Sequence, residues 1–121
     1  MQKVSELDYI TYHNHRVEPY FTFVKNGQKT IEGRIRKGYY CLIKPGDHII
    51  IYNEEETDNI EVLVKSVRNY KSIKEMIENE PLKKILPDVE AIDQGIEVYR
   101  RFYTQEQEEK FGIVAIEIER L

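Results

Sequence analysis

The sequence predicts an α+β protein in which a small β-barrel carries a helical insert. Segments in which apolar and polar residues alternate lie before and after residues 72–110, where the apolar residues have helical spacing. The strand expected over 60–68 has apolar residues at both parities, which indicates burial on both faces, as in a barrel. Strands that enclose a block of helices are typical of the α+β class. A length of 121 residues predicts one domain, 1–121.

The first part of the chain is predicted to contain a loose arm or edge strand over 1–12, then a helix and a strand. Residues 17–26 predict the helix, because apolar side chains recur at i, i+3 and i+4. Gly27 can end it in a left-handed conformation. Residues 29–36 alternate, with isoleucines at one parity and charged residues at the other, and predict a strand with one buried face. The Pro–Gly pair that includes Gly46 predicts a turn.

The second part is predicted to be mainly helical between strands at 48–52 and 60–68 and a closing strand at 112–119. Ser72 is followed three residues later by a glutamate, and Thr104 by a glutamine, so both are expected to be helix N-caps. The helix expected over 91–103 has an apolar stripe that we predict to be mostly buried. The stripe consists of Ile92, Ile96, Tyr99 and Tyr103.

The charge of the chain excludes a protein that coats nucleic acid by bulk electrostatics. There are 18 lysines and arginines against 22 acidic residues, a net charge of −4. Residues 25–37 nevertheless hold five basic residues and one acidic residue, a local excess of +4. A locally basic patch on an acidic domain fits a small anionic ligand better than a long polyanion, although a solvated surface gives the same pattern.

Several classes of site and of location are not expected. The one cysteine, Cys41, excludes an internal disulfide framework and a multi-cysteine zinc site. His13 and His15 would share a face of an extended segment, but no third ligand stands at a suitable spacing, so we expect no metal and no cofactor. No apolar run reaches the roughly 20 residues of a membrane span, and no signal peptide is evident. The expectation is a soluble cytoplasmic protein without a membrane partner.

The basic patch contains a group of residues whose chemistry suits ligand binding. Strand alternation places Glu32 and Arg34 on one face, about 7 Å apart, close enough to pair or to share a ligand. Arginine offers a planar, bidentate donor to a phosphate or a base edge, and glutamate accepts hydrogen bonds from amines. Lys29 has the other parity and would either reach solvent or point into a cavity. The alternative is a surface ion pair between Glu32 and Arg34, worth under about 1 kcal/mol.

The segment from Gly27 to Arg34 resembles the GxKxxExR signature of the ASCH-domain family at its four fixed positions, Gly27, Lys29, Glu32 and Arg34. Further short blocks resemble members from archaea and bacteria in the same order. These blocks are IKPGD (43–47), VRNYKS (67–72), ILP (85–87), GIEVYRRFY (95–103) and GIVAIEI (112–118). The resemblance covers roughly 13–119.

The resemblance implies a PUA-like β-barrel fold and the binding of RNA or a nucleotide-like ligand in a cleft beside the motif strand. Lys29, Glu32 and Arg34 would then be the ligand-binding residues. A hydrolase is the alternative, either a ribonuclease or an amidohydrolase, with Lys29 and Glu32 as candidate catalytic residues. Similar amidohydrolases that act on acetylated cytidine use a lysine and a threonine three residues later, where this chain has Glu32, so that activity is not expected. A protein-interaction module is the third possibility.

Other residues are candidates for the same cleft, and the sequence leaves each of them open. Arg36 extends the charged face of the motif strand, and Lys65 and Arg68 would add positive charge if their strand borders the cleft. Tyr99 and Arg100 would supply an aromatic ring and a cation from the expected helix 91–103. Exposed surface, for the cations, and core packing, for the tyrosine, are the alternatives. Gly27 and Gly46 are expected to be structural.

Overall fold

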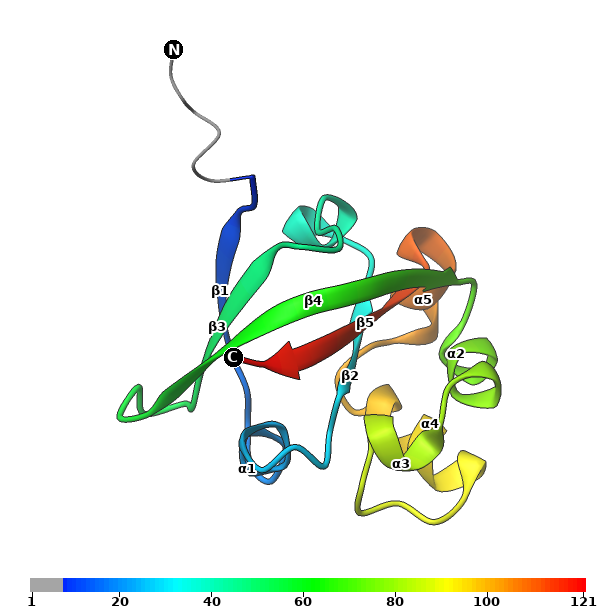
Figure 1. The fold of residues 1–121 in the computed structure, drawn as a ribbon. Coiled ribbons are helices and arrows are strands. Elements are labelled where there is room, and N and C mark those ends of the chain that lie inside the picture. Colours follow the sequence, from blue (N-terminus) through cyan, green and yellow to red (C-terminus); the bar gives the residue numbers. More distant parts are fainter. Residues whose placement is uncertain (1–7) are drawn as a thin grey trace.

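The computed structural model describes residues 8–121, which form five strands and five α-helices (Figure 1). The strands are β1 (Thr11–His15), β2 (Ile31–Ile35), β3 (His48–Tyr52), β4 (Asn59–Tyr70) and β5 (Ile113–Arg120). The helices are α1 (Tyr20–Lys25), α2 (Ile73–Asn79), α3 (Leu82–Ile85), α4 (Ile92–Arg100) and α5 (Gln105–Phe111). The 3-10 turn Gly38–Cys41 precedes β3.

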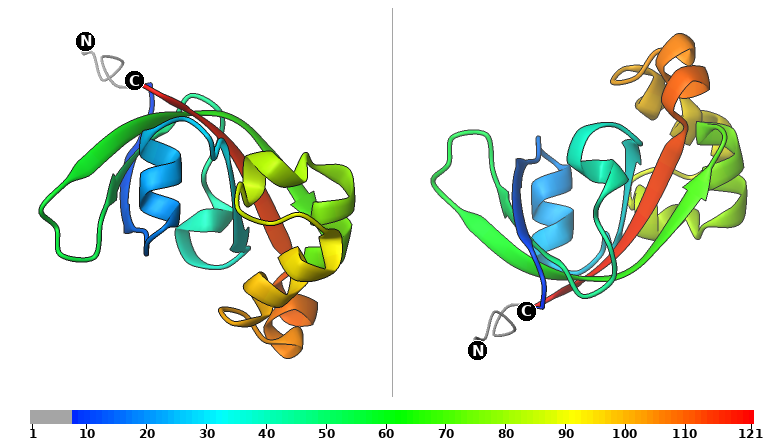
Figure 2. Two further views of the ribbon diagram at one scale, coloured as in Figure 1. Left: turned by 90° about the horizontal axis from the view of Figure 1, so that it is seen from below. Right: turned by 90° about the horizontal axis from the view of Figure 1, so that it is seen from above.

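One mixed sheet, in the order β1-β3-β4-β5-β2, holds all five strands. The β1–β3 pair is parallel and the other three pairs are antiparallel. The sheet curves around α1, whereas α2, α3, α4 and α5 gather beside the other end of β4 and β5 (Figure 2). The prediction of an α+β fold with a small, PUA-like barrel is therefore confirmed as a half-barrel, whose edge strands are β1 and β2.

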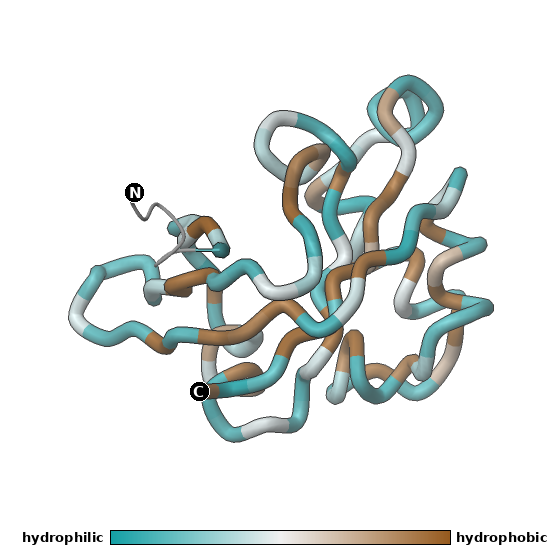
Figure 3. Tube along the Cα trace, turned by 45° about the horizontal axis from the view of Figure 1, so that its top comes forward, coloured by the Kyte–Doolittle hydropathy of each residue, from teal (hydrophilic) through white to brown (hydrophobic). Residues whose placement is uncertain are grey.

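Each face of β5 contributes to a different hydrophobic core, because alternate side chains point to opposite faces of a sheet. Val114 and Ile116 pack inside the half-barrel with Phe21 and Val24 of α1. The opposite face of β5 packs against α2, α3 and α4. That second core includes Ile31, Ile73, Met76, Ile85, Tyr99, Ile113 and Ala115. Figure 3 shows the hydrophobic residues along the central strands and the hydrophilic loop between β3 and β4.

The local signals predicted the caps and turns correctly. Ser72 Oγ accepts a hydrogen bond from the backbone N–H of Glu75, and Thr104 Oγ1 accepts one from Gln107. Gly27 and Gly46 have φ values of 85° and 96°, a region that glycine occupies without steric cost. The strand at 48–52 has the predicted bounds. Of the segment 1–12, Thr11 and Tyr12 lie in the edge strand β1, and 1–7 fall outside the described residues.

Several predicted elements differ from the structure at their ends. The helix expected over 17–26 is limited to α1, and the helix expected over 91–103 ends at Arg100 because the chain turns after it. The predicted stripe is partly wrong. Ile92 is 39% exposed, whereas Val98 and Gly95 are buried. Within residues 8–121, no helix combines the length and the hydrophobicity needed to cross a membrane.

Candidate functional site

The motif strand β2 opens into a cavity near the gap between the two sheet edges. We call it the motif cavity; its volume is about 190 Å³. It is lined by His15, Arg16, Val17, Tyr20, Lys29, Glu32, Gly33, Arg34, Leu86, Val98, Tyr99, Phe102 and Tyr103. Glu32 and Arg34 share this cavity, as their common parity predicted. The expectation that β2 buries only one face is wrong, because the charged face lines an interior space instead of meeting solvent: Glu32 is 3% exposed.

Glu32 forms a bidentate ion pair with Arg16, the residue that follows β1. Arg16 Nη2 lies 2.7 Å from Glu32 Oε1, and Arg16 Nε donates to Oε2 at 3.1 Å. Burial raises the pKa of Glu32, and the charge of Lys29 opposes this shift. The surface ion pair between Glu32 and Arg34 is therefore not what the structure shows. A buried pair with a residue from the opposite sheet edge takes its place.

Lys29 is also buried, with 4% of its surface exposed. Its Nζ donates hydrogen bonds to the backbone oxygens of Ile31, at 2.8 Å, and Ile85, at 2.5 Å. Because β2 begins at Ile31, strand parity does not extend to Lys29, and its side chain lines the same cavity as Glu32. Burial lowers the pKa of Lys29, and the Glu32 charge opposes this shift. Two acceptors leave one N–H of the ammonium group for a ligand.

Arg34 has a hydrogen-bonding group that no residue among 8–121 satisfies. Its guanidinium carbon lies 5.2 Å from the centre of the Tyr40 ring, which places the guanidinium against the aromatic face. The Nη2 atom is buried and lacks a hydrogen-bond partner within the described residues. A buried donor without a partner is rare in native proteins and costs about 1–3 kcal/mol, or more when it is charged. The Nη2 group of Arg34 is therefore available to donate a hydrogen bond to a bound ligand.

Aromatic rings complete the cavity wall. Tyr20 comes from α1, Tyr99 from α4, and Phe102 and Tyr103 from the turn after α4. The Tyr99 hydroxyl approaches β2 at Gly33, where a side-chain Cβ would lie only 2.7 Å from it. Glycine at this position thus permits the close contact between the helix and the strand.

The charges of the motif cavity favour an anionic or carbonyl-rich ligand. Its lining holds three cations, Arg16, Lys29 and Arg34, against the single carboxylate of Glu32. Rings at the wall can pack against a planar group while the charged side chains contact its edge. No group of three or more histidine, cysteine or acidic residues suited to a metal ion occurs in 8–121.

The structure separates Lys65 and Arg68 from the motif cavity. Both line a second cavity of about 410 Å³, which we call the outer cavity and which extends from α1 across β4 and β5 to α3. The expectation that they share the cleft of Glu32 and Arg34 is wrong, because these strands turn their Ser66, Arg68 and Glu117 side chains away from the half-barrel interior. Lys29 lines both cavities.

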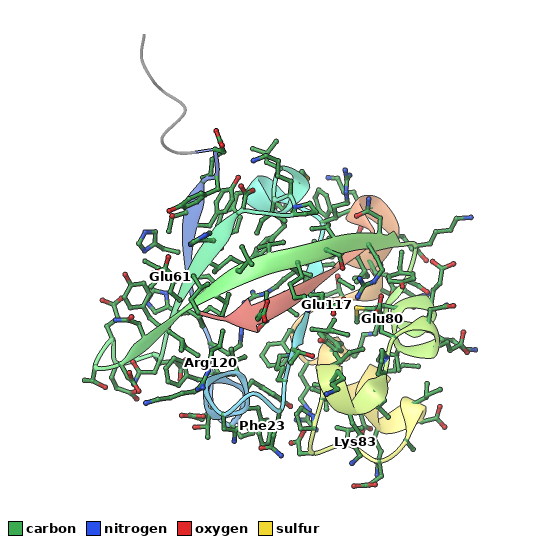
Figure 4. The ribbon with its side chains drawn as sticks, in the orientation of Figure 1. Phe23, Glu61, Glu80, Lys83, Glu117 and Arg120 are labelled. Atoms are coloured by element: carbon green, nitrogen blue, oxygen red, sulfur yellow. The ribbon has the colours of Figure 1, made fainter. Side chains whose placement is uncertain are left out.

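Arg68 is held by acidic partners in the outer cavity. Its Nε and Nη2 donate to Glu80 at 2.5 and 2.8 Å, and its Nη1 donates to Glu117 at 3.1 Å. Tyr70 also donates to Glu80, at 2.5 Å. Figure 4 shows Glu80 and Glu117 close together beside β5 and α2. With these partners, Arg68 is committed to the protein's own network.

We expect the Glu80 network to make stability sensitive to acid. Burial favours the neutral form of Glu80, but hydrogen bonds from Arg68 and Tyr70 outweigh it and lower the pKa of the carboxyl group. A group with a lowered folded-state pKa stabilises the protein above its unfolded pKa, about 4.3, and loses that contribution as the pH falls through the folded value. Urea unfolding between about pH 6 and pH 3 should therefore show a smaller loss of stability in Glu80→Gln than in the native protein. Equal pH dependence of the two proteins would contradict this role.

Two further candidates from the sequence lie outside the motif cavity. Arg36 is exposed and lines neither cavity. Arg100 is exposed and its Nη2 lies 3.3 Å from Glu108 Oε1, while Tyr99, one residue before it, does line the cavity. Arg16 and Phe102 also line the motif cavity, although neither was predicted from the sequence. The basic charge of Arg16 and the aromatic run 102–103 were visible, but nothing local placed them beside β2.

Comparison with known proteins identifies similar chains. The family model of the ASCH domain matches residues 15–121. A hypothetical protein, PH0355, has a crystal structure that is 43% identical in sequence, with a TM-score of 0.83, over 92% of this chain and 99% of that one. The solution structure of protein PF0455 from Pyrococcus furiosus is also 43% identical, with a TM-score of 0.73, over 92% and 97% of the two chains.

A more distant structure shares the fold. The ASCH domain from Lactobacillus crispatus is 11% identical to this chain and has a TM-score of 0.63, over 90% of this chain and 79% of that one. No curated protein matches the chain significantly.

Proposed function

Because this chain belongs to the ASCH domain family, which is generally thought to bind RNA, we propose that its motif cavity binds an unpaired base of single-stranded RNA. The observation that carries the proposal is the buried Arg34 Nη2, which has no partner among residues 8–121. A carbonyl oxygen of a base, or a phosphate oxygen, would supply the acceptor. An arginine fork is suited to such acceptors because its N–H groups lie in one plane.

The neighbouring groups support a planar ligand with both donors and acceptors. Glu32 retains lone pairs beyond those used by Arg16 and can accept from an exocyclic amine or a ring N–H. Lys29 provides a further donor. The walls of Tyr20 and Tyr99 offer surfaces on which a base can pack. RNA-binding proteins commonly read unpaired bases in this way, by packing on rings and hydrogen bonding to base edges.

The volume of the cavity limits what it can hold. Pockets that enclose a whole small-molecule ligand usually measure about 300–1,000 Å³. The motif cavity, at about 190 Å³, is smaller. We therefore assign it to the base alone, with the sugar and phosphates at its mouth. The acidic net charge of −4 agrees with a local site better than with a long nucleic-acid track.

The test compares Arg34→Gln on β2 with Arg36→Gln, a matched control at the residue that follows the end of this strand. Each change removes one positive charge, but only Arg34 lines the cavity. With fluorescein-labelled single-stranded RNAs of each base, fluorescence anisotropy should show about 10- to 150-fold weaker binding by Arg34→Gln, the equivalent of about 1.5–3 kcal/mol for a hydrogen bond to a charged group. Binding by Arg36→Gln should change less than about threefold, with a salt slope lower by at most about 0.7.

The proposal is overturned if both variants melt at the native temperature and bind the RNAs as tightly as the native protein does. If both variants lose affinity to the same extent, binding depends on overall positive charge and not on the motif cavity, and the proposal is again overturned. Chromatography of the RNA after incubation distinguishes the hydrolase alternative, in which Lys29 and Glu32 would exchange protons with the substrate, because only turnover yields product. A protein-interaction module would bind none of the RNAs.

A further inference from the structure

An exposed aromatic ring lies at the mouth of the motif cavity. Phe102 is 51% exposed and also lines the cavity. Its backbone is fixed by the turn after α4, since the N–H groups of Phe102 and Tyr103 both donate to the Tyr99 oxygen, at 3.0 and 2.9 Å. Phe102 therefore lines the same cavity as Tyr99 and Tyr103, with its backbone position set by this turn.

The position of Phe102 sets it apart from the other exposed hydrophobic side chains. Single exposed apolar residues are normal on protein surfaces and need no special account. The other large ones in 8–121 are Ile10, Leu42, Ile92 and Leu121, and they line neither the motif cavity nor the outer cavity. Phe102 alone among these exposed residues borders a site whose wall is aromatic and whose lining is cationic.

We propose that Phe102 stacks on the base adjacent to the one in the motif cavity, so that the site takes at least two consecutive unpaired nucleotides. The inference rests on the proposed function, and it specifies an oligonucleotide in place of a free nucleoside. Stacking on an aromatic ring tolerates every base, because each base has a π-face. Selectivity for one base would then come from the motif cavity, and stacking on Phe102 would add affinity.

The experiment uses two sets of labelled RNA trinucleotides. In the first set the central base is flanked by abasic sites, and in the second set all three bases are present. Phe102→Ala should weaken binding of the complete trinucleotides by about 5- to 150-fold more than it weakens binding of the abasic-flanked set. Ile92→Ala is the matched control, since Ile92 is 39% exposed on α4 and outside the cavity. It should bind both sets as the native protein does.

A second variant gives a direct signal. The chain has no tryptophan, so Phe102→Trp introduces a single tryptophan at the cavity mouth, whose emission can be excited selectively at wavelengths where the tyrosines do not absorb. This variant should retain the affinity for complete trinucleotides, and its fluorescence should be quenched by them but not by the abasic-flanked set.

The outcomes separate the two proposals. If flanking bases add no affinity, or if Phe102→Ala weakens both sets equally, the stacking role is wrong while the assignment of the cavity stands. If neither set binds and Arg34→Gln changes nothing, both proposals fall. If the native protein forms a dimer in solution that Phe102→Ala dissociates, the ring belongs to a contact between copies, and the stacking role is again overturned.

Discussion

Replacing Glu32 with alanine is expected to lower the free energy of unfolding by about 3–5 kcal/mol, the usual cost of breaking a buried ion pair. Glu32 is 3% exposed, and the Arg16 side chain that it binds is 10% exposed. The buried Lys29 ammonium lies in the same cavity. Alanine at position 32 would leave two desolvated cations without the only carboxylate that lines the motif cavity. Most of the lost stability therefore comes from leaving buried positive charge without a counter-charge, and less comes from the lost contact between Glu32 and Arg16.

The measurement is urea unfolding followed by circular dichroism, with Glu61→Ala as a control. Glu61 is also a strand carboxylate with a basic partner, His48, but its side chain is 45% exposed, so its loss should cost under about 1 kcal/mol. Joint replacement of Arg16 and Glu32 by Met and Leu should recover part of the stability that Glu32→Ala loses, because it removes one cation together with the carboxylate. A loss of under 1 kcal/mol in Glu32→Ala would show that the cavity is more hydrated than its burial indicates.

Ile85→Ala is expected to cost about 2–5 kcal/mol, as large-to-small changes in a packed core do. Ile85 is 0% exposed and packs in the core that also holds Ile31 and Val89. It belongs to α3, a helix of four residues that is too short to be stable without tertiary contacts. The backbone oxygen of Ile85 also accepts a hydrogen bond from the ammonium group of Lys29, so loosening α3 would disturb the motif cavity as well.

The same substitution at Ile92 provides the comparison. Ile92→Ala removes the same atoms from a side chain that is 39% exposed, and its cost should stay within about 1 kcal/mol. Thermal melts and urea titrations of both variants decide the matter. If Ile92→Ala lost as much stability as Ile85→Ala, Ile92 would be a core residue, as the apolar stripe in the sequence predicts.

The sequence predicted the parts of the fold that depend on nearby residues. Ser72 and Thr104 cap their helices through hydrogen bonds that span three residues, and Gly27 and Gly46 adopt positive φ. These preferences arise from sterics and hydrogen bonds within one turn of the chain. The strand at 48–52 also followed from its local pattern.

Helix phase was harder to predict, because a stripe of apolar residues does not say which neighbours will cover it. In α4 the buried residues are Gly95, Val98 and Tyr99, so the buried face shares only Tyr99 with the predicted stripe. The glycine is buried because its missing side chain leaves room for Ile77 and Leu82, which an added Cβ would meet at 3.2 and 3.3 Å. Hydrophobicity alone gives glycine no such role.

The residues at the candidate site divide in the same way. Strand alternation predicted that Glu32 and Arg34 lie on one face, and both line the motif cavity. The ASCH resemblance of this segment agrees with the family match. The separation of Arg68 from them could not be read from the chain. It depends on the irregular pairing of β4 with β5 between Val64 and Ser66, which shifts the register of the two strands. A bulge of this kind changes which side chains face the barrel.

By itself, then, the sequence determined the strand and helix types, the capping and turn residues, and the pair of charges on β2. Only the tertiary structure decided that Arg16 reaches Glu32 from the other edge of the sheet, that Lys29 joins them, and that Phe102 borders the same cavity. The physical reason is the range of the forces involved. Dihedral preferences and capping bonds act over a few residues, whereas the parallel β1–β3 pair and the position of α4 follow from burying apolar surface contributed by the whole chain.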